Sequence, residues 1–174
     1  MIRTAFRIHP TPLGDALIVV GDEGLVVLHV QDGPDDDALH ELAEALGAFP
    51  DPDAEATASV ATQLDEYFAG SRRAFELDLD LRLVRGFTRA ALRAVCEIPY
   101  GETASYGEVA VAAGSPRAHR AVGSACARTP ISIVVPAHRV VRTDGSIGEY
   151  GGRPEHKRFL LGLEAGGIST SARE

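Results

Sequence analysis

The sequence predicts an α+β protein of two modules, a mixed one over residues 1–82 and a mostly helical one over residues 83–174. A chain of 174 residues can bury one ordinary core or two small ones. Strand-like and helix-like segments alternate in the first half, whereas helix-capping signals crowd the second half. The charge also changes sign, from −13 over residues 1–80 to +5 over residues 81–174. Together these observations place a domain boundary near residue 82.

The first module contains a predicted β-hairpin, two helices and an edge strand. The runs ALIVVG and LVVLHV, within residues 15–31, are rich in β-branched side chains and are joined by the turn Asp22-Glu23-Gly24. Helical patterns follow over residues 36–47, after an acidic loop, and over residues 57–69, each ending at a glycine. Residues 74–81 alternate apolar and acidic side chains, which predicts a strand with one solvated face. This module shows no set of catalytic residue types.

The second module opens with a predicted helix over residues 87–97, whose apolar face includes Cys96. We interpret Cys96 as a small core residue rather than a nucleophile. The apolar run at residues 131–136 has the length of a strand that is buried on both faces. A last helix is predicted over residues 154–164, with Pro154 at its first position.

Between these elements the capping signals predict a helix-turn-helix. Ser105 and Glu108 form the S-x-x-E pattern of a capping box, which begins a short helix over residues 106–113. Ser115 then caps a second helix over residues 116–128, with a proline at its first position. This helix carries three arginines between small residues: Arg117, Arg120 and Arg128. Such a face fits a DNA groove and its phosphates, and the alternative is the solvated face of a helical hairpin.

Composition limits the cellular context. The net charge of −8 argues against a nucleic-acid partner, but the positive charge of the second half is what a nucleic-acid-binding domain would show. The alternative is that the charge difference only reflects an ordinary acidic surface on the first half. No apolar run reaches the roughly 20 residues of a membrane span, and the N-terminus has no secretory core. We therefore expect a cytoplasmic protein with no membrane partner. Cys96 and Cys126 lack metal-ligand spacing, so we expect no metal site and no cofactor.

Four motifs in the second module carry a family resemblance: IPYGETASYGEVA, GSPRAHRAVG, PISIVVPAHRVV and GEYGG. In order and spacing they closely resemble the DNA-binding half of the O6-alkylguanine-DNA alkyltransferases, also called methylated-DNA–protein-cysteine methyltransferases. In the first module, TPLG before the hairpin and LDEYFAG resemble the same family more weakly. The resemblance implies an N-terminal ribonuclease-H-like α+β domain and a C-terminal, winged-helix-like domain that contains the helix-turn-helix.

The resemblance also identifies a missing nucleophile. The family transfers an alkyl group to the cysteine of P-C-H-R-V, helped by a histidine that a glutamate holds. The corresponding histidine and glutamate are His138 and Glu164, but the nucleophile position is Ala137. A methyl group has no lone pair to attack the alkyl carbon, so we expect no transfer. The chain thus resembles the alkyltransferase-like proteins, which bind O6-alkylguanine for nucleotide excision repair, although most of them lack an N-terminal module.

Further site residues follow from the resemblance. Stacking hides O6 in a duplex, so the base must rotate out. Arg120 corresponds to a minor-groove finger that fills the gap, and Tyr106 to a tyrosine that contacts the 3′ phosphate. The other expected DNA contacts are Arg117 and Thr143. The expected lesion pocket consists of Cys126, Ala137, Ile147, Gly148, Tyr150 and Gly151, with Tyr150 donating toward the guanine. Arg139 is interpreted as a structural tether.

Three residues at this site raise questions. Thr129 stands where the family has an asparagine that bonds across a turn, so we expect a looser loop. His119 replaces a small residue beside the finger, where it either contacts the groove or hinders approach. Cys126 could accept the alkyl group in place of the missing cysteine, but no histidine lies beside it in the sequence, which favours a wall role.

We therefore predict a monomeric lesion-binding protein whose partners are duplex DNA with O6-alkylguanine and nucleotide excision repair proteins. One alternative is a methyltransferase whose nucleophilic cysteine was replaced by alanine, which a cysteine codon at position 137 of the native gene would indicate. The other is a helix-turn-helix regulator that discriminates between sequences rather than between O6 substituents.

Overall fold

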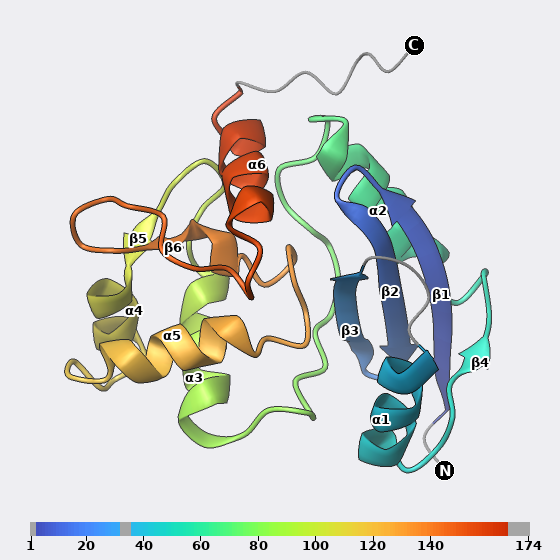
Figure 1. Cartoon of the computed structure of the whole chain (residues 1–174). Helices are drawn as coiled ribbons and strands as arrows, with labels where there is room; N and C mark the ends of the chain where they lie inside the picture. The colour runs from blue at the N-terminus through green and yellow to red at the C-terminus, as the bar shows by residue number, and fades with distance from the viewer. Residues whose placement is uncertain (1–2, 32–35, 167–174) are drawn as a thin grey trace. The chain divides into compact units, whose positions relative to one another are not determined.

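The computed structural model describes residues 3–31 and 36–166. The chain divides into two compact units, Met1–Leu83 and Val84–Glu174. The first unit contains a four-stranded sheet and two helices, and the second consists mainly of short helices (Figure 1). This architecture confirms the α+β class that the sequence predicts. No helix in the described part of the chain is both long enough and apolar enough to cross a membrane.

The sheet of the first unit has the strand order β3-β2-β1-β4. Its strands are β1 (Thr4–Thr11), β2 (Gly14–Gly21), β3 (Gly24–Gln31) and β4 (Asp51–Pro52). The predicted hairpin is β2 and β3. Strand β1, which the sequence analysis did not predict, pairs with β2 along its whole length. It tolerates Pro10 because β4 pairs only with Ala5 and Phe6, so the edge at Pro10 requires no N–H donor.

Helices α1 (Asp36–Leu46) and α2 (Ala58–Phe68) confirm the two helices predicted in this unit and lie on opposite faces of the sheet (Figure 1). Helix α1 has no fully buried residue and packs on the sheet core through three half-buried leucines, Leu39, Leu42 and Leu46. Helix α2 buries a wider face that includes Leu64 and Tyr67. The two faces of the sheet are therefore covered to different degrees.

The edge strand predicted over residues 74–81 is wrong. Burial does alternate along residues 74–79, but the segment meets the sheet only at a single parallel bridge between Leu25 and Leu79. The alternation ends at Asp80, which is buried rather than solvated because its carboxylate binds the Arg82 guanidinium. An internal ion pair thus replaces the solvated face that the pattern predicts.

The second unit places four helices and two short strands around its core. Its elements are α3 (Gly86–Cys96), β5 (Ala104–Ser105), α4 (Tyr106–Ala112), α5 (His119–Ala127), the 3₁₀ turn η1 (Ala137–Arg139), β6 (Val140–Val141) and α6 (Pro154–Glu164). Helix α5 packs against both α3 and α4, and β5 pairs with β6 in parallel. These contacts fix the helix-turn-helix formed by α4 and α5.

One of the two predicted helix caps is correct. Ser105 and Glu108 form both bonds of the capping box, with Ser105 N–H donating to Glu108 at 2.6 Å and Glu108 N–H donating to the Ser105 hydroxyl at 3.1 Å. The predicted start of the next helix at Pro116 is wrong. The Ala118 N–H donates to the Ser115 carbonyl at 2.9 Å, which closes a turn, and α5 begins only at His119. Arg117 therefore lies in the turn rather than on the helix.

The strand predicted over residues 131–136 is also wrong. Ile131, Ile133 and Val135 are buried as expected, but the segment is a series of tight turns in which Ile133 has a φ of 68°. Within it, the Val134 N–H donates to the Ser132 carbonyl at 2.7 Å. The surrounding helices bury these side chains, so the apolar run needs no sheet partner.

Candidate functional site

A pocket of about 390 Å³ opens between α4, α5 and the segments that follow η1. Its lining comprises Tyr106, His119, Gly123, Cys126, Ala127, Ala137, Arg142, Glu149, Tyr150, Gly151 and Gly152. Small side chains dominate the wall contributed by α5, and glycines recur in the loop. Pockets of this size hold small organic groups, and a purine base lies within that range.

Two glycines bring the walls of the pocket close to Tyr106. A Cβ on Gly123 would lie 3.8 Å from the Tyr106 ring, so α5 passes close to that ring. A Cβ on Gly148, whose φ is 68°, would lie 3.3 Å from the Tyr106 hydroxyl and 3.6 Å from Arg142 Nε. The loop after β6 therefore folds against the two side chains that form one rim of the pocket.

The Tyr150 hydroxyl is buried at the pocket without a hydrogen-bond partner among the described residues. Burial raises the pKa of this phenol, so it stays protonated and keeps a donor at neutral pH. Leaving such a donor buried and unsatisfied costs about 1–3 kcal/mol. The tyrosine is therefore poised to donate to a polar ligand in the pocket.

The residues that follow Ala137 in the sequence belong to a buried polar cluster centred on Glu164. His138 Nε2 lies 2.7 Å from Glu164 Oε1, and Arg139 donates to both carboxylate oxygens at 2.9 Å. Arg139 also donates to the Ile98 carbonyl at 2.6 Å, which confirms its predicted role as a structural tether. Burial alone would raise the pKa of Glu164, but hydrogen bonds from His138 and Arg139 outweigh it and lower the pKa to about 2.

His138 is fully buried and neutral. Burial lowers the pKa of its imidazole despite the hydrogen bond to Glu164, which acts in the opposite direction. Because an ionised carboxylate only accepts, Nε2 carries the proton and Nδ1 presents a lone pair. Nδ1 has no partner among the described residues. The histidine is thus arranged as a base, next to an alanine whose side chain offers no proton to remove.

Neither cysteine is arranged as a nucleophile. Burial raises the pKa of Cys126 to about 11, although the nearby Lys157 acts in the opposite direction. Burial likewise raises the pKa of Cys96 to about 11, and Cys96 lies outside the pocket lining. Both thiols are therefore almost entirely protonated at neutral pH, which makes them poor nucleophiles.

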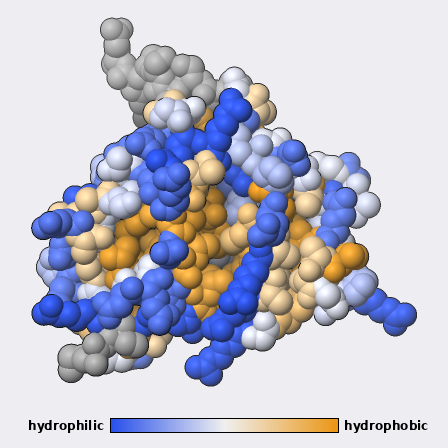
Figure 2. Space-filling view, turned by 180° about the vertical axis from the view of Figure 1, so that it is seen from behind, coloured by the Kyte–Doolittle hydropathy of each residue, from blue (hydrophilic) through white to orange (hydrophobic). Residues whose placement is uncertain are grey.

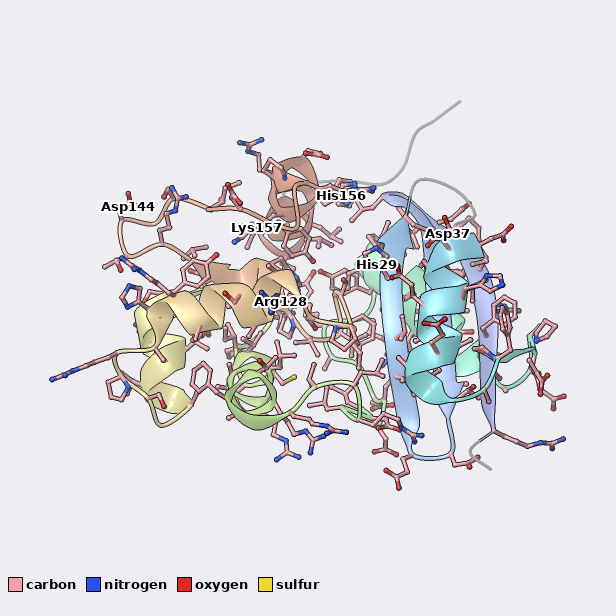
Figure 3. The ribbon with its side chains drawn as sticks, turned by 60° about the horizontal axis from the view of Figure 1, so that its bottom comes forward. His29, Asp37, Arg128, Asp144, His156 and Lys157 are labelled. Carbon is pink, nitrogen blue, oxygen red and sulfur yellow. The ribbon has the colours of Figure 1, made fainter. Side chains whose placement is uncertain are left out.

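Lys157, which the sequence analysis did not single out, is a second buried cation of this unit besides Arg139. It extends from α6 and donates to the Val140 carbonyl at 2.6 Å, and its Nζ lies 5.9 Å from the centre of the Tyr106 ring (Figure 3). Burial lowers the pKa of Lys157 to about 8. In the sequence, the only sign that this residue is buried is the position of a lysine on the apolar face of a predicted helix. Its partners could not be predicted, because they come from segments distant in the sequence.

The structure brings four of the six predicted pocket residues to the lining: Cys126, Ala137, Tyr150 and Gly151. Ile147 and Gly148 lie outside the lining, and Gly148 instead packs against Tyr106 and Arg142. Five further lining residues were not singled out individually from the sequence: Gly123, Ala127, Arg142, Glu149 and Gly152. His119, noted only as a departure from the family pattern, also lines the pocket.

Of the predicted DNA-contacting residues, Tyr106 lines the pocket, and the other three are exposed and lie outside its lining. Arg120 is exposed in the first turn of α5, Arg117 in the preceding turn and Thr143 in the loop after β6. The Thr129 hydroxyl accepts from the Ile131 N–H at 3.3 Å and donates to the Ile131 carbonyl at 3.2 Å. The threonine thus provides a bridge of its own across the turn where the family has an asparagine.

The two units together define a helix-turn-helix protein with a base-sized pocket and an appended α+β domain. Family models match both units: the DNA binding domain of 6-O-methylguanine DNA methyltransferase over residues 86–166 and its ribonuclease-like domain over residues 5–81. The chain belongs to the O6-alkylguanine-DNA alkyltransferase family.

Relatives from archaea and bacteria share this assignment. A methylated-DNA–protein-cysteine methyltransferase of Methanosarcina barkeri is 47% identical over 104 residues. The match covers 60% of this chain and 65% of that protein, so it spans just under two thirds of the length of that relative. One from Methanosarcina acetivorans is 35% identical over 91% of this chain and 97% of that protein. The Mycobacterium tuberculosis O6-methylguanine methyltransferase structure has a TM-score of 0.79 at 35% identity, covering 97% of this chain and 96% of that one. The M. tuberculosis OGT structure in complex with DNA has a TM-score of 0.77 at 34% identity, with the same coverage.

Proposed function

We propose that this chain binds duplex DNA containing O6-alkylguanine, holds the flipped base in the pocket and does not remove the alkyl group. The observation that carries the proposal is Ala137, which lies 1% exposed at the pocket beside a complete His138–Glu164 pair. Where the family reaction requires a thiolate, this chain has a methyl group. The base arrangement persists, but it has no nucleophile to activate.

Three features support base binding. The pocket holds about 390 Å³, and the unsatisfied Tyr150 hydroxyl supplies a donor for a purine ring. Arg120 is exposed in the first turn of α5, where it can fill the gap that a flipped base leaves. A related protein, M. tuberculosis OGT, has been solved in complex with DNA, which supports duplex DNA as the partner.

The proposal is tested by measuring binding and covalent transfer on the same protein. We expect an O6-methylguanine duplex to compete more strongly than an unmodified duplex of the same sequence at fixed salt, because only the modified base offers the O6 substituent to the pocket. We also expect intact-protein mass spectrometry to show no gain of a methyl group after incubation. A methylated protein would overturn the proposal, and locating the methyl group on Cys126 would identify that residue as the acceptor.

A second candidate is a methyltransferase in which alanine has replaced the nucleophilic cysteine. The intact cluster of His138, Glu164 and Arg139 favours it, since this machinery serves transfer in the family. An Ala137→Cys variant should then regain methyl transfer, while the His138→Phe/Ala137→Cys double variant should not. If Ala137→Cys folds and binds the lesion but accepts no methyl group, the chain has lost more than its nucleophile and the first proposal is favoured.

We further propose that this chain is a cytoplasmic monomer and that it passes the bound lesion to nucleotide excision repair proteins. A protein that holds damage without removing it contributes to repair only if another activity excises the lesion. A complex that forms with excision-repair proteins on the lesion duplex, and not on plain duplex, would support this part.

A further inference from the structure

We propose that Arg142 binds the backbone phosphate beside the flipped nucleotide, the same phosphate that the family resemblance assigns to Tyr106, an inference that rests on the proposed function. Both side chains line the same pocket. Both also lie close to Gly148: a Cβ added to this glycine would be 3.3 Å from the Tyr106 hydroxyl and 3.6 Å from Arg142 Nε. A neutral and a cationic donor thus converge at one rim of the pocket, a combination suited to a phosphodiester.

Arg142 is available for such a contact. Its side chain is exposed, and no acidic side chain lies within 4.0 Å of its guanidinium in the part of the chain that the structure describes. The nearest acid in sequence, Asp144, instead accepts from the Ser146 N–H at 2.9 Å and from the Ser146 hydroxyl at 2.7 Å. Figure 3 shows Asp144 at the outer end of this loop. The guanidinium charge is therefore not neutralised by a direct partner.

The surrounding structure fixes the backbone of Arg142 and the ring of Tyr106. The Arg142 N–H donates to the Ser146 carbonyl, and the Gly145 N–H donates to the Arg142 carbonyl, each at 2.9 Å. These bonds close the turn from which the arginine extends. On the other side, Lys157 Nζ lies over the Tyr106 ring at 5.9 Å, and α5 approaches the same ring at Gly123. A tyrosine ring that is already packed, and an arginine on a closed turn, lose less conformational entropy on binding than the same side chains on an open loop.

One acidic residue opposes the site. Glu149 is exposed and lines the same pocket. Burial is the main cause of the raised pKa of Tyr106; beside it, the charge of Glu149 raises that pKa and the charge of Arg142 lowers it. Replacing Glu149 should therefore have the opposite effect to replacing Arg142. This pair of variants separates the role of the arginine from a general disturbance of the loop.

The test measures the salt dependence of DNA binding by the full-length chain. Each phosphate neutralised by a cation contributes about 0.9 to the slope of log affinity against log salt. Arg142→Ala should reduce that slope by about 0.9 and weaken binding roughly tenfold, on O6-methylguanine and plain duplexes alike. Arg142→Lys should keep the slope, and Glu149→Gln should strengthen binding. Arg93→Ala, at an exposed arginine of α3 outside the pocket lining, is the matched control and should leave the slope unchanged.

A double-mutant cycle then tests whether the phosphate is shared. Tyr106→Phe removes only the hydroxyl, so it should weaken binding without changing the slope, and its effect should largely disappear once Arg142 is alanine. An unchanged slope in folded Arg142→Ala, or strictly additive effects of the two variants, would overturn the inference. The proposed function is judged separately, by the preference of the unaltered chain for the lesion duplex, so the two can fail independently.

Discussion

At the scale of single residues, Glu164 is the centre of the buried polar cluster formed with His138 and Arg139. It accepts hydrogen bonds from His138 and Arg139, and the Gly101 N–H also donates to it at 3.3 Å. His138 and Arg139 are buried, so their bonds to the carboxylate could not simply be replaced by bonds to water if it were removed. Breaking a buried charged pair by changing one partner typically costs about 3–5 kcal/mol. The cluster therefore has a structural role whether or not the chain transfers alkyl groups.

We predict that Glu164→Gln lowers the free energy of unfolding by about 3 kcal/mol, since the amide keeps the shape but leaves the Arg139 charge uncompensated. Urea denaturation at pH 7 measures this. Glu155→Gln, at an exposed site in the first turn of the same helix, is the control and should change stability by less than about 0.5 kcal/mol. Equal effects of the two changes would contradict the assigned role.

The same carboxylate sets an acid limit on stability. The folded-state pKa of Glu164, about 2, lies below its ordinary value of 4.5, so its contribution is complete above pH 4.5 and is lost as the pH falls toward 2. The pKa of His138 is also lowered, so protonation favours the unfolded state and stability declines as the pH falls below 6.5. We expect unfolding free energies to decline in both windows, and Glu164→Gln to reduce the decline in the lower one, to which Glu108 and Asp144 also contribute. A decline below pH 4.5 that persists unchanged in this variant would count against the assignment.

Residues of the site differed in how far the sequence could predict them. The family resemblance placed Ala137, His138 and Glu164 in one site, although the last two lie 26 positions apart in the sequence. It could not place Arg142 or Lys157, because their roles depend on where a glycine-rich loop and α6 meet Tyr106. A motif identifies groups that act together in a reaction, whereas packing neighbours require the folded backbone.

At the scale of elements, local signals succeeded where one segment determines its own structure. The capping box at Ser105 closes within four residues and was predicted correctly. Strand β1 was missed because Pro10 argues against a strand, and only the short reach of β4 makes that proline acceptable. The run at residues 131–136 resembles a buried strand but turns at Ile133. In both failures, the deciding information lies in a neighbouring element.

The hairpin turn gives an element-scale prediction. Gly24 has a φ of 129°, and a Cβ there would lie 2.3 Å from the Asp78 carbonyl oxygen, part of the chain that crosses the edge of β3. We expect Gly24→Ala to destabilise the first unit by about 3 kcal/mol or more, through backbone strain and the displacement of residue 78. Hydrogen exchange of β2 and β3 amides measures the effect within that unit.

Gly47→Ala is the matched control for this clash. Gly47 has a φ of 74° but nothing lies within 4 Å of its added Cβ, so only the left-handed backbone penalty of about 1 kcal/mol applies. If the two variants were equally destabilised, the approach of residue 78 to the turn would have no energetic importance.

At the scale of the whole chain, the net charge of −8 conceals two opposite contributions to DNA binding. The basic balance lies beyond residue 80, with the pocket, and the acidic balance lies before it. Long hydrophilic side chains project from the face shown in Figure 2. From these charges alone, we expect the acidic first half to weaken the attraction of the chain for a polyanion, an effect that screening by salt reduces.

This repulsion should be visible in a charge variant of α1. Glu41 and Glu44 are exposed on that helix, and changing both to glutamine keeps helix propensity nearly constant. At low salt we expect lesion and plain duplexes to bind more tightly by the same small factor, roughly twofold, because the effect is long-range. Near 0.15 M salt, where the screening length is about 8 Å, the difference should vanish. A gain that persists at high salt, or that favours only the lesion duplex, would mean instead that the first unit acts directly at the DNA or at the pocket.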